Sequence, residues 1–251
     1  MGTEQDSSQQ GANRRFVIMG LPRSGTTYLM TLLNAHRDIY CSGEQFNPHA
    51  IVGDKRRNER LGAITQRDRE AVRFMNRFFA RHEDKGYARV GFKFMIGHNI
   101  RVLRRLEKDT SISLIYVHRK NKLAQVSSLI KAAQSQKWAQ HRADAHVSRK
   151  IQAGPRQISH RWHEYATFDH LFEPWFEARP HHKIALEYRE LFAPGFERRI
   201  SDFLGVAPDP GMKSPLVKQG SNRILDRFED PDKIEKYFRE LGLEAWLETE
   251  I

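Results

Sequence analysis

The stretch FVIMGLPRSGTTYLM, residues 16–30, decides the fold. It opens with apolar, partly branched side chains, the composition of a buried strand. A polar loop follows, and from Thr26 the apolar pattern is that of a helix. A strand that passes through such a loop into a helix directs backbone N–H groups and the positive end of the helix dipole at one point. The segment therefore predicts an anion site, for which phosphate is the usual occupant.

The glycine spacing in this loop nearly fits the phosphate-binding pattern G-x-x-x-x-G-K-[ST]. Gly20 and Gly25 match its glycines, and Thr27 matches its last position, but Thr26 stands where the lysine belongs. Because that lysine normally reaches the β- and γ-phosphates, its absence argues against hydrolysis of ATP or GTP. The cation inside the loop is Arg23. We expect the loop to bind a 5′-phosphate-type group without processing a triphosphate.

Short apolar runs alternate with helical patterns along the chain. Strands are expected at 15–20, 89–95, 111–118 and 181–187, and helices at 26–36, 99–108, 122–138, 195–204 and 231–241. This alternation predicts an α/β fold: a single domain, 14–251, with a central parallel β-sheet flanked by helices and a P-loop-like nucleotide-binding architecture. Residues 1–13 are expected to form a disordered tail. Residues 47–63 and 141–154 fit neither pattern and stand where loops over the carboxyl edge of the sheet could fall.

Composition limits the class of protein. Lysine plus arginine outnumber aspartate plus glutamate by 42 to 31, a formal net charge of +11 that favours an anionic partner. The polar start of the chain lacks the apolar core of a secretory signal, and no apolar run approaches the length of a membrane span. The single cysteine, Cys41, excludes an intramolecular disulfide and a cysteine-based zinc cluster. We therefore expect a cytoplasmic protein without a transmembrane segment.

The loop LPRSGTT resembles the 5′-phosphosulfate-binding loop of sulfotransferases that use 3′-phosphoadenosine-5′-phosphosulfate (PAPS), where a proline and a basic residue precede Ser-Gly-Thr or Ser-Gly-Ser. The resemblance implies transfer of a sulfuryl group from PAPS to an acceptor hydroxyl, with adenosine 3′,5′-bisphosphate (PAP) as product. Arg23 is then also expected to stabilise charge on the leaving group. The residues that the resemblance assigns to the donor are Pro22, Arg23, Ser24, Gly25, Thr26 and Thr27.

A second segment, residues 111–138, resembles the 3′-phosphate site of the same family. An apolar strand leads to Arg119, and the helix after it presents Ser127 and Ser128. Arginine supplies a forked, permanently charged donor, and serine supplies a neutral one. The stretch LAQVSSLIKAAQSQKW is similar to the bacterial carbohydrate sulfotransferases of the trehalose-modifying type, in which the serine would be Ser128. Both serines remain candidates.

The segment CSGEQF, residues 41–46, places Glu44 where the strand after the first helix would end. Its Gly-Glu pair resembles the carbohydrate branch, whose glutamate is the proposed catalytic base. The residues that follow, 45–48, depart from the Gly-Glu-Pro start of that branch, so the acceptor stays open between a saccharide, a glycolipid and a small natural product. His98 and His49 are rival candidates for the base.

Three weaker features complete the expected site. Lys93, in GFKFM, resembles a family lysine near the active site, and the stretch LVKQGSNR falls where the family closes a loop over the nucleotide, so Lys218 and Arg223 are candidate phosphate ligands. The aromatic residues between 162 and 176 are spaced as one buried helix face, with a wall for a sugar or lipid acceptor as the alternative.

Two other classes of function compete. A P-loop-like nucleotide kinase is opposed by the missing lysine at position 26. A non-catalytic nucleotide- or nucleic-acid-binding protein fits the charge, but the basic residues are dispersed and no recognition motif appears, so no nucleic-acid partner is expected. No carboxylate cluster or histidine pair indicates a metal. A homodimer is compatible with the related branch.

Overall fold

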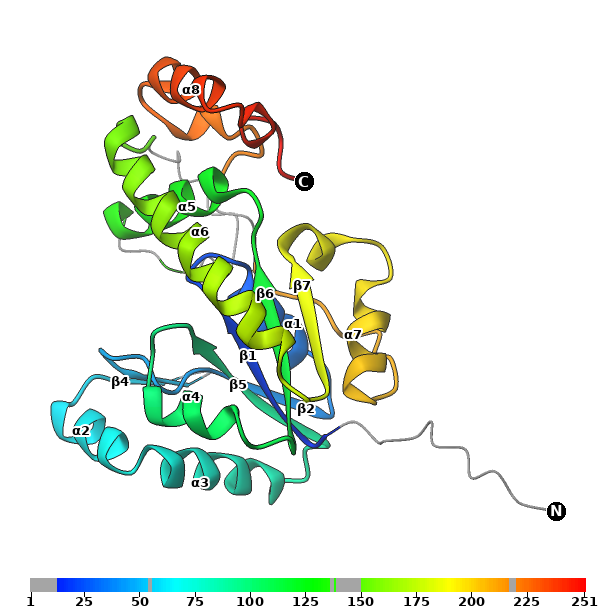
Figure 1. The fold of residues 1–251 in the computed structure, drawn as a ribbon. Helices are drawn as coiled ribbons and strands as arrows, with labels where there is room; N and C mark the ends of the chain where they lie inside the picture. The colour runs from blue at the N-terminus through cyan, green and yellow to red at the C-terminus, as the bar shows by residue number, and fades with distance from the viewer. Residues whose placement is uncertain (1–12, 54–55, 136–137, 139–149, 217–219) are drawn as a thin grey trace.

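The protein is built around a five-stranded sheet whose strand order is β2-β5-β1-β6-β7, with every pair parallel (Figure 1). The computed structural model describes residues 13–53, 56–135, 138, 150–216 and 220–251. The strands are β1 (Arg15–Gly20), β2 (Ile39–Glu44), β5 (Arg89–Met95), β6 (Ile112–His118) and β7 (Lys183–Glu187). All of their carboxyl ends lie at one edge of the sheet. The predicted single α/β domain with a central parallel sheet is confirmed.

The middle strand, β1, is buried on both of its faces. Phe16 and Ile18 pack against the helices on one side of the sheet, and Val17 and Met19 pack against those on the other side. All four side chains are fully buried. This is why the sequence of the strand is continuously apolar rather than alternating.

Helices cover both faces of the sheet (Figure 1). On one face lie α1 (Thr26–Asn34), the 3₁₀ helix η1 (Tyr188–Phe192) and α7 (Phe196–Leu204). On the other lie α3 (Ala71–Glu83), α4 (Ile100–Leu106) and the second half of α6 (Pro155–Glu177). A third apolar cluster stands above the carboxyl edge; it contains α5 (Lys122–Ser135), the first half of α6, η2 (Leu225–Arg227), α8 (Pro231–Glu240) and η3 (Glu244–Trp246).

The structure departs from the sequence-based prediction mainly between β2 and β5. The unassigned stretch 47–63 contains a two-stranded hairpin, β3 (Ile51–Val52) and β4 (Arg57–Asn58), and the start of α2 (Leu61–Arg69). Helices α2 and α3 were not predicted, although the buried positions of α3, namely Ala71, Met75, Phe78, Phe79 and His82, follow a helical spacing. Residues 1–12 of the expected tail and 141–149 of the second unassigned stretch lie outside the described residues.

The aromatic helix is α6, and its burial is only partly as predicted. Tyr165, Phe172 and Phe176 are buried, as one helix face would be, and Phe172 and Phe176 pack with Tyr116 of β6. Phe168, in contrast, is 43% exposed. The face therefore serves mainly as core.

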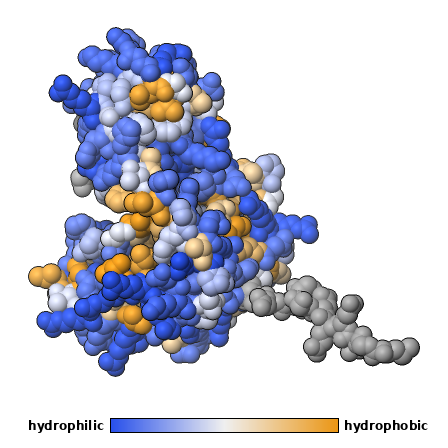
Figure 2. All heavy atoms as spheres, viewed as in Figure 1, coloured by the Kyte–Doolittle hydropathy of each residue, from blue (hydrophilic) through white to orange (hydrophobic). Residues whose placement is uncertain are grey.

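The surface is strongly hydrophilic, in keeping with a mean hydropathy of −0.68. Figure 2 shows apolar residues in separate patches: one on the upper part of the molecule, and others around the indentation beneath it and on the lower part. None of the helices in the described part of the chain has the length and apolar character needed to cross a membrane.

Candidate active site

The loop between β1 and α1 forms an open helix N-terminus at the carboxyl edge of the sheet. Gly25 precedes the helix with φ 106°, and among the described residues no side chain caps the first turn of α1. A Cβ at Gly25 would lie 2.7 Å from Leu191 Cδ1 and 2.9 Å from Tyr188 Cδ2, so glycine is required by conformation and by space. The first-turn amides are therefore left to bind an anion.

Side chains from β6 and α5 hold the same loop from the other side. Arg119 donates from Nη1 to the carbonyl oxygen of Arg23 at 2.9 Å, and Gln125 donates from Nε2 to that of Pro22 at 2.9 Å. Arg23 has a positive φ of 65°. The hydroxyl of Ser24 is buried and has no hydrogen-bond partner among the described residues. The two motifs expected to bind the two ends of a nucleotide are thus in direct contact.

A carboxylate reaches the loop through one lysine. Lys93 of β5 donates from Nζ to Thr27 Oγ1 at 2.7 Å and to Glu44 Oε1 at 3.1 Å. Asn47 donates from Nδ2 to Glu44 Oε2 at 2.6 Å, and His98 Nε2 lies 4.0 Å from the same oxygen. Glu44 ends β2, so two adjacent strands of the sheet deliver its carboxylate and Lys93 to the same edge.

The charges in this cluster follow from burial and from Lys93. Burial alone would raise the pKa of Glu44, but the charge of Lys93 and hydrogen bonds from Asn47 and Lys93 outweigh it, so the pKa is lowered. Burial lowers the pKa of His98 to about 4, with a smaller opposing effect from Glu44. At neutral pH the cluster therefore holds an ionised carboxylate beside a neutral imidazole.

Two arginines and a carboxylate are buried together next to the loop. Glu250 accepts from Nε of Arg119 at 2.5 Å and also from its Nη2, and Arg227 Nη2 lies 3.5 Å from Glu250 Oε2. Arg227 also donates from Nη1 to Ser127 Oγ at 3.0 Å. The Arg119 guanidinium stacks 4.1 Å from the centre of the Tyr188 ring. This cluster therefore has two buried arginines for one carboxylate.

The two candidate serines point to different partners. Ser127 is fully buried against Arg227, whereas Ser128 Oγ accepts from Arg23 Nε at 2.9 Å. Burial and then the nearby Arg119 lower the pKa of Arg23 to about 10, so Arg23 stays charged at neutral pH. Ser127 therefore lies with the buried arginine pair, and Ser128 lies with the loop cation.

Other candidates lie away from these clusters. Arg223 is exposed, with its Nε 3.9 Å from Asp226 Oδ2, and His49 is also exposed. Lys218 lies outside the described residues. Arg227, four residues after Arg223, reaches the cluster instead. Arg227 and Glu250 were not predicted from the sequence, because the position of each depends on how residues 220–251 pack against α5 and Arg119.

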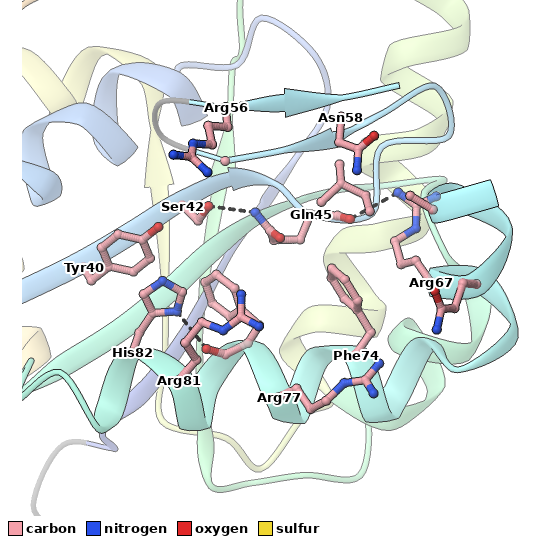
Figure 3. Close-up of a pocket in the computed structure, with 15 residues that line it drawn as sticks. Tyr40, Ser42, Gln45, Arg56, Asn58, Arg67, Phe74, Arg77, Arg81 and His82 are labelled. Atoms are coloured by element: carbon pink, nitrogen blue, oxygen red, sulfur yellow. Dashed lines mark hydrogen bonds between the residues drawn. The ribbon is translucent and has the colours of Figure 1, made fainter. Parts of the chain in front are cut away.

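A separate pocket of about 690 Å³ opens on the other side of β2, between the β3–β4 hairpin and α3 (Figure 3). Tyr40 stacks on His82 with ring centres 4.0 Å apart, and Gln45 donates to Ser42 Oγ at 2.7 Å within it. Its arginines come from the hairpin and from the helices: Arg56, Arg67, Arg77 and Arg81. Arg67 donates to the carbonyl oxygens of Gln45, Asn47 and Ala50, and Arg77 pairs with Glu70, so these two arginines hold the walls of the pocket together. Glu44 lies beyond a β-bulge in β2 and turns instead to Lys93.

No group of three or more histidine, cysteine, aspartate or glutamate side chains that could hold a metal ion occurs in the described part of the chain.

The parallel sheet and the open helix N-terminus at its carboxyl edge define a P-loop-like α/β protein. Residues 15–210 match the sulfotransferase family, and the chain belongs to that family, as predicted. It is 28% identical to Nodulation protein H of Rhizobium meliloti (strain 1021) over 134 residues, 52% of each chain, and a second Nodulation protein H from Rhizobium meliloti is 28% identical over 136 residues. The alignment thus spans about half the length of these curated relatives.

Two solved structures share the fold over nearly the whole chain. The sulfotransferase domain from the Synechococcus PCC 7002 olefin synthase is 15% identical, has a TM-score of 0.50, and is matched over 94% of this chain and 91% of its own. The sulfotransferase domain from the curacin biosynthetic pathway is 14% identical, with a TM-score of 0.50 and coverage of 94% and 90%. At these identities the likeness shows the fold alone.

Proposed function

We propose that this protein transfers a sulfuryl group from PAPS to a hydroxyl of a saccharide, a glycolipid or a small natural product, and releases PAP. The observation that carries the proposal is the position of Lys93, whose ammonium contacts both Thr27 of the anion-binding loop and the Glu44 carboxylate. A reacting group bound at the loop would therefore lie next to a carboxylate, the arrangement that general-base catalysis requires.

The residues around the loop fit a nucleotide with phosphates at both ends. Three features suit the 5′-phosphosulfate: the first turn of α1 and the Ser24 hydroxyl, neither of which has a side-chain partner in the described part of the chain, and the charged Arg23. Arg119, Arg227 and Ser127 suit the 3′-phosphate, since forked guanidinium groups bind phosphate through paired hydrogen bonds. The 3′ contacts would distinguish PAPS from ATP.

Glu44 is proposed as the general base. In the transfer, the acceptor oxygen bonds to sulfur as the bond from sulfur to the bridging oxygen breaks, and Glu44 takes the acceptor proton. Lys93 keeps the pKa of Glu44 low in the present arrangement. An anion at the loop would share the Lys93 ammonium and so raise that pKa toward the range of an effective base. Arg23, Thr26 and Thr27 are placed to stabilise charge on the leaving group.

His98 is better suited to position Glu44 than to replace it. Its Nδ1 accepts from the backbone N–H of Met95 at 3.3 Å. In the neutral imidazole the other nitrogen then carries the hydrogen, and this Nε2 faces Glu44. His98 therefore presents a donor to the carboxylate rather than a vacant acceptor for a substrate proton.

Calorimetric titration with PAP, with AMP and ATP as controls, tests the donor assignment. We expect PAP to bind at least tenfold more tightly than AMP, about 1.4 kcal/mol, and Arg119→Ala to abolish this preference. Equal binding of PAP and AMP to the wild-type protein would overturn the assignment and return attention to the kinase and nucleic-acid-binding classes.

Further parts of the proposal follow from the sequence. We propose that the catalytic domain comprises residues 14–251, that the protein acts in the cytoplasm and that it forms a homodimer. We also propose that transfer needs no metal, so activity should persist in excess chelator; strict dependence on magnesium would contradict this scheme.

A further inference from the structure

Glu250 places a carboxylate where the proposed donor needs a phosphate. Its two oxygens accept from the Nε and Nη2 of Arg119, and one of them also lies 3.5 Å from Arg227 Nη2. The three residues are buried, with Glu250 only 2% exposed. This paired geometry is the one that a guanidinium also makes with a phosphate. One carboxylate thus engages both arginines of the proposed 3′-phosphate site.

The segment that carries Glu250 is fastened by specific contacts. Trp246 packs against the apolar cluster of α5, α6 and α8, and its carbonyl oxygen accepts from Asn121 Nδ2 at 3.0 Å. On the far side of Glu250, Asn222 donates from Nδ2 to the carbonyl oxygen of Ile251. These contacts on both sides hold the carboxylate at the arginines.

The neighbours of Glu250 in sequence are less firmly held. Glu248, Thr249 and Ile251 are all exposed. The Thr249 carbonyl oxygen accepts a long hydrogen bond, 3.5 Å, from Arg189 Nη2. Of the four residues after Leu247, Glu250 is the one whose side chain is buried. Movement of this short segment would therefore expose little apolar surface. Trp246 therefore anchors the segment, and beyond it the described contacts are those of the Glu250 side chain and the hydrogen bonds to the carbonyl oxygens of Thr249 and Ile251.

The charges of Arg119, Arg227 and Glu250 favour replacement of the Glu250 carboxylate by an anion of higher charge. Among the described residues, Arg119 and Arg227 share the negative charge of a single carboxylate in a buried place. A phosphate monoester carries about −1.5 to −2 at neutral pH. It would therefore neutralise both arginines, and the released Glu250 would return to water.

We propose that Glu250 is an internal competitor for the 3′-phosphate of the donor, and that binding of PAPS or PAP displaces it from Arg119 and Arg227. The proposal rests on the proposed function. Glu250 then determines donor specificity, because only a nucleotide that carries a 3′-phosphate replaces the contacts that its carboxylate makes. A nucleotide without that phosphate, such as AMP, binds at the loop while Glu250 stays in place.

The test is calorimetric titration of wild type, Glu250→Gln and a matched control, Glu248→Gln, with PAP and with AMP. Glu248 lies on the same segment but is exposed. We expect Glu250→Gln to bind PAP about tenfold more tightly than wild type, since apparent affinity rises as the competent fraction rises. Its AMP affinity should change less than about twofold, and Glu248→Gln should match wild type for both ligands.

A second measurement needs no change at Glu250. Cys41 is buried, so a nitroxide can be attached selectively at Glu248→Cys. We expect the label to become more mobile when PAP is added and to stay unchanged with AMP. Unchanged mobility with saturating PAP, or equal PAP affinities of wild type and Glu250→Gln, would overturn the displacement. If neither protein prefers PAP over AMP, the donor assignment itself fails and the inference falls with it.

Discussion

The Nζ atom of Lys93 lies 2.7 Å from Thr27 Oγ1 and 3.1 Å from Glu44 Oε1, so a single ammonium group joins the start of α1 to a carboxylate. The three residues come from α1, β2 and β5. Because Lys93 is buried, its charge acts on both neighbours with little screening by water. Both the turnover of the protein and the pH dependence of its stability should therefore depend on this contact.

Replacing the proposed base should remove turnover and leave nucleotide binding intact. We expect Glu44→Gln to lower kcat by about 10²–10⁴ and to change PAP affinity little, because glutamine keeps the size of the side chain and can still accept from Lys93. PAP release from PAPS, with an acceptor found by screening a saccharide panel, measures the first effect, and calorimetry measures the second. Glu59→Gln, on an exposed loop, is the control. Wild-type turnover in Glu44→Gln would show that another group is the base.

Removing Lys93 should change how stability depends on pH. In the wild type the lowered pKa of Glu44 gives stability that is complete above its ordinary value, about 4.3, and lost as pH falls through the lower folded value. In Lys93→Met the charge that lowers the pKa of Glu44 is absent, so burial raises that pKa. Protonation of Glu44 then removes an unpaired buried charge. We expect the gap in unfolding free energy between the two proteins to be largest at pH 7 and to narrow toward pH 3, in urea titrations. A gap independent of pH would contradict the ion pair.

His98 should give a separate loss of stability in weak acid. Its folded pKa of about 4 lies below the ordinary value of 6.5, so the unfolded chain binds more protons between these values. Stability should be complete above pH 6.5 and fall by up to about 3 kcal/mol as pH approaches 4. Urea titrations of His98→Gln should lack this part of the fall. If the unfolding free energy of His98→Gln depends on pH as that of the wild type does, His98 is not the group that causes the loss of stability in weak acid.

Arg227 and Arg223 offer a matched pair for the 3′-phosphate site. Arg227 is buried against Ser127 and Glu250, whereas Arg223 is exposed beside Asp226. We expect Arg227→Ala to weaken PAP binding by about tenfold or more, the usual effect of losing a charged hydrogen bond, and to leave AMP binding nearly unchanged. Arg223→Ala should behave as wild type in the same titrations. The opposite result would assign the phosphate to Arg223.

Gly25 should tolerate no side chain. Gly25→Ala combines a left-handed backbone, which costs about 1–2 kcal/mol, with contacts below 3.0 Å to Leu191 and Tyr188. We expect a clear drop in Tm together with weaker PAP binding. In Gly62→Ala, a helical glycine with open space around it, the same substitution should leave Tm unchanged or raise it slightly. Equal behaviour of the two variants would show that the loop can relax around a side chain.

The sequence by itself determined the parallel sheet, the loop between β1 and α1 and the order in which Arg23, Glu44 and Arg119 reach the sheet edge. These features depend on local patterns: an apolar strand, a glycine where the chain must turn, and a helix directly after it. For the same reason the predicted bounds of β1 and β5 agree with the structure.

Only the tertiary structure decided which side chains meet. Arg119 and Glu250 are 131 residues apart, and the choice of Arg227 over Arg223 depends on how the chain packs over α5. Likewise, Lys93 can join the loop to the Glu44 carboxylate only because β5 pairs with β2 in the sheet. Such contacts form between segments with no periodic relation in sequence, because long-range packing, not local preference, sets the distances between their side chains.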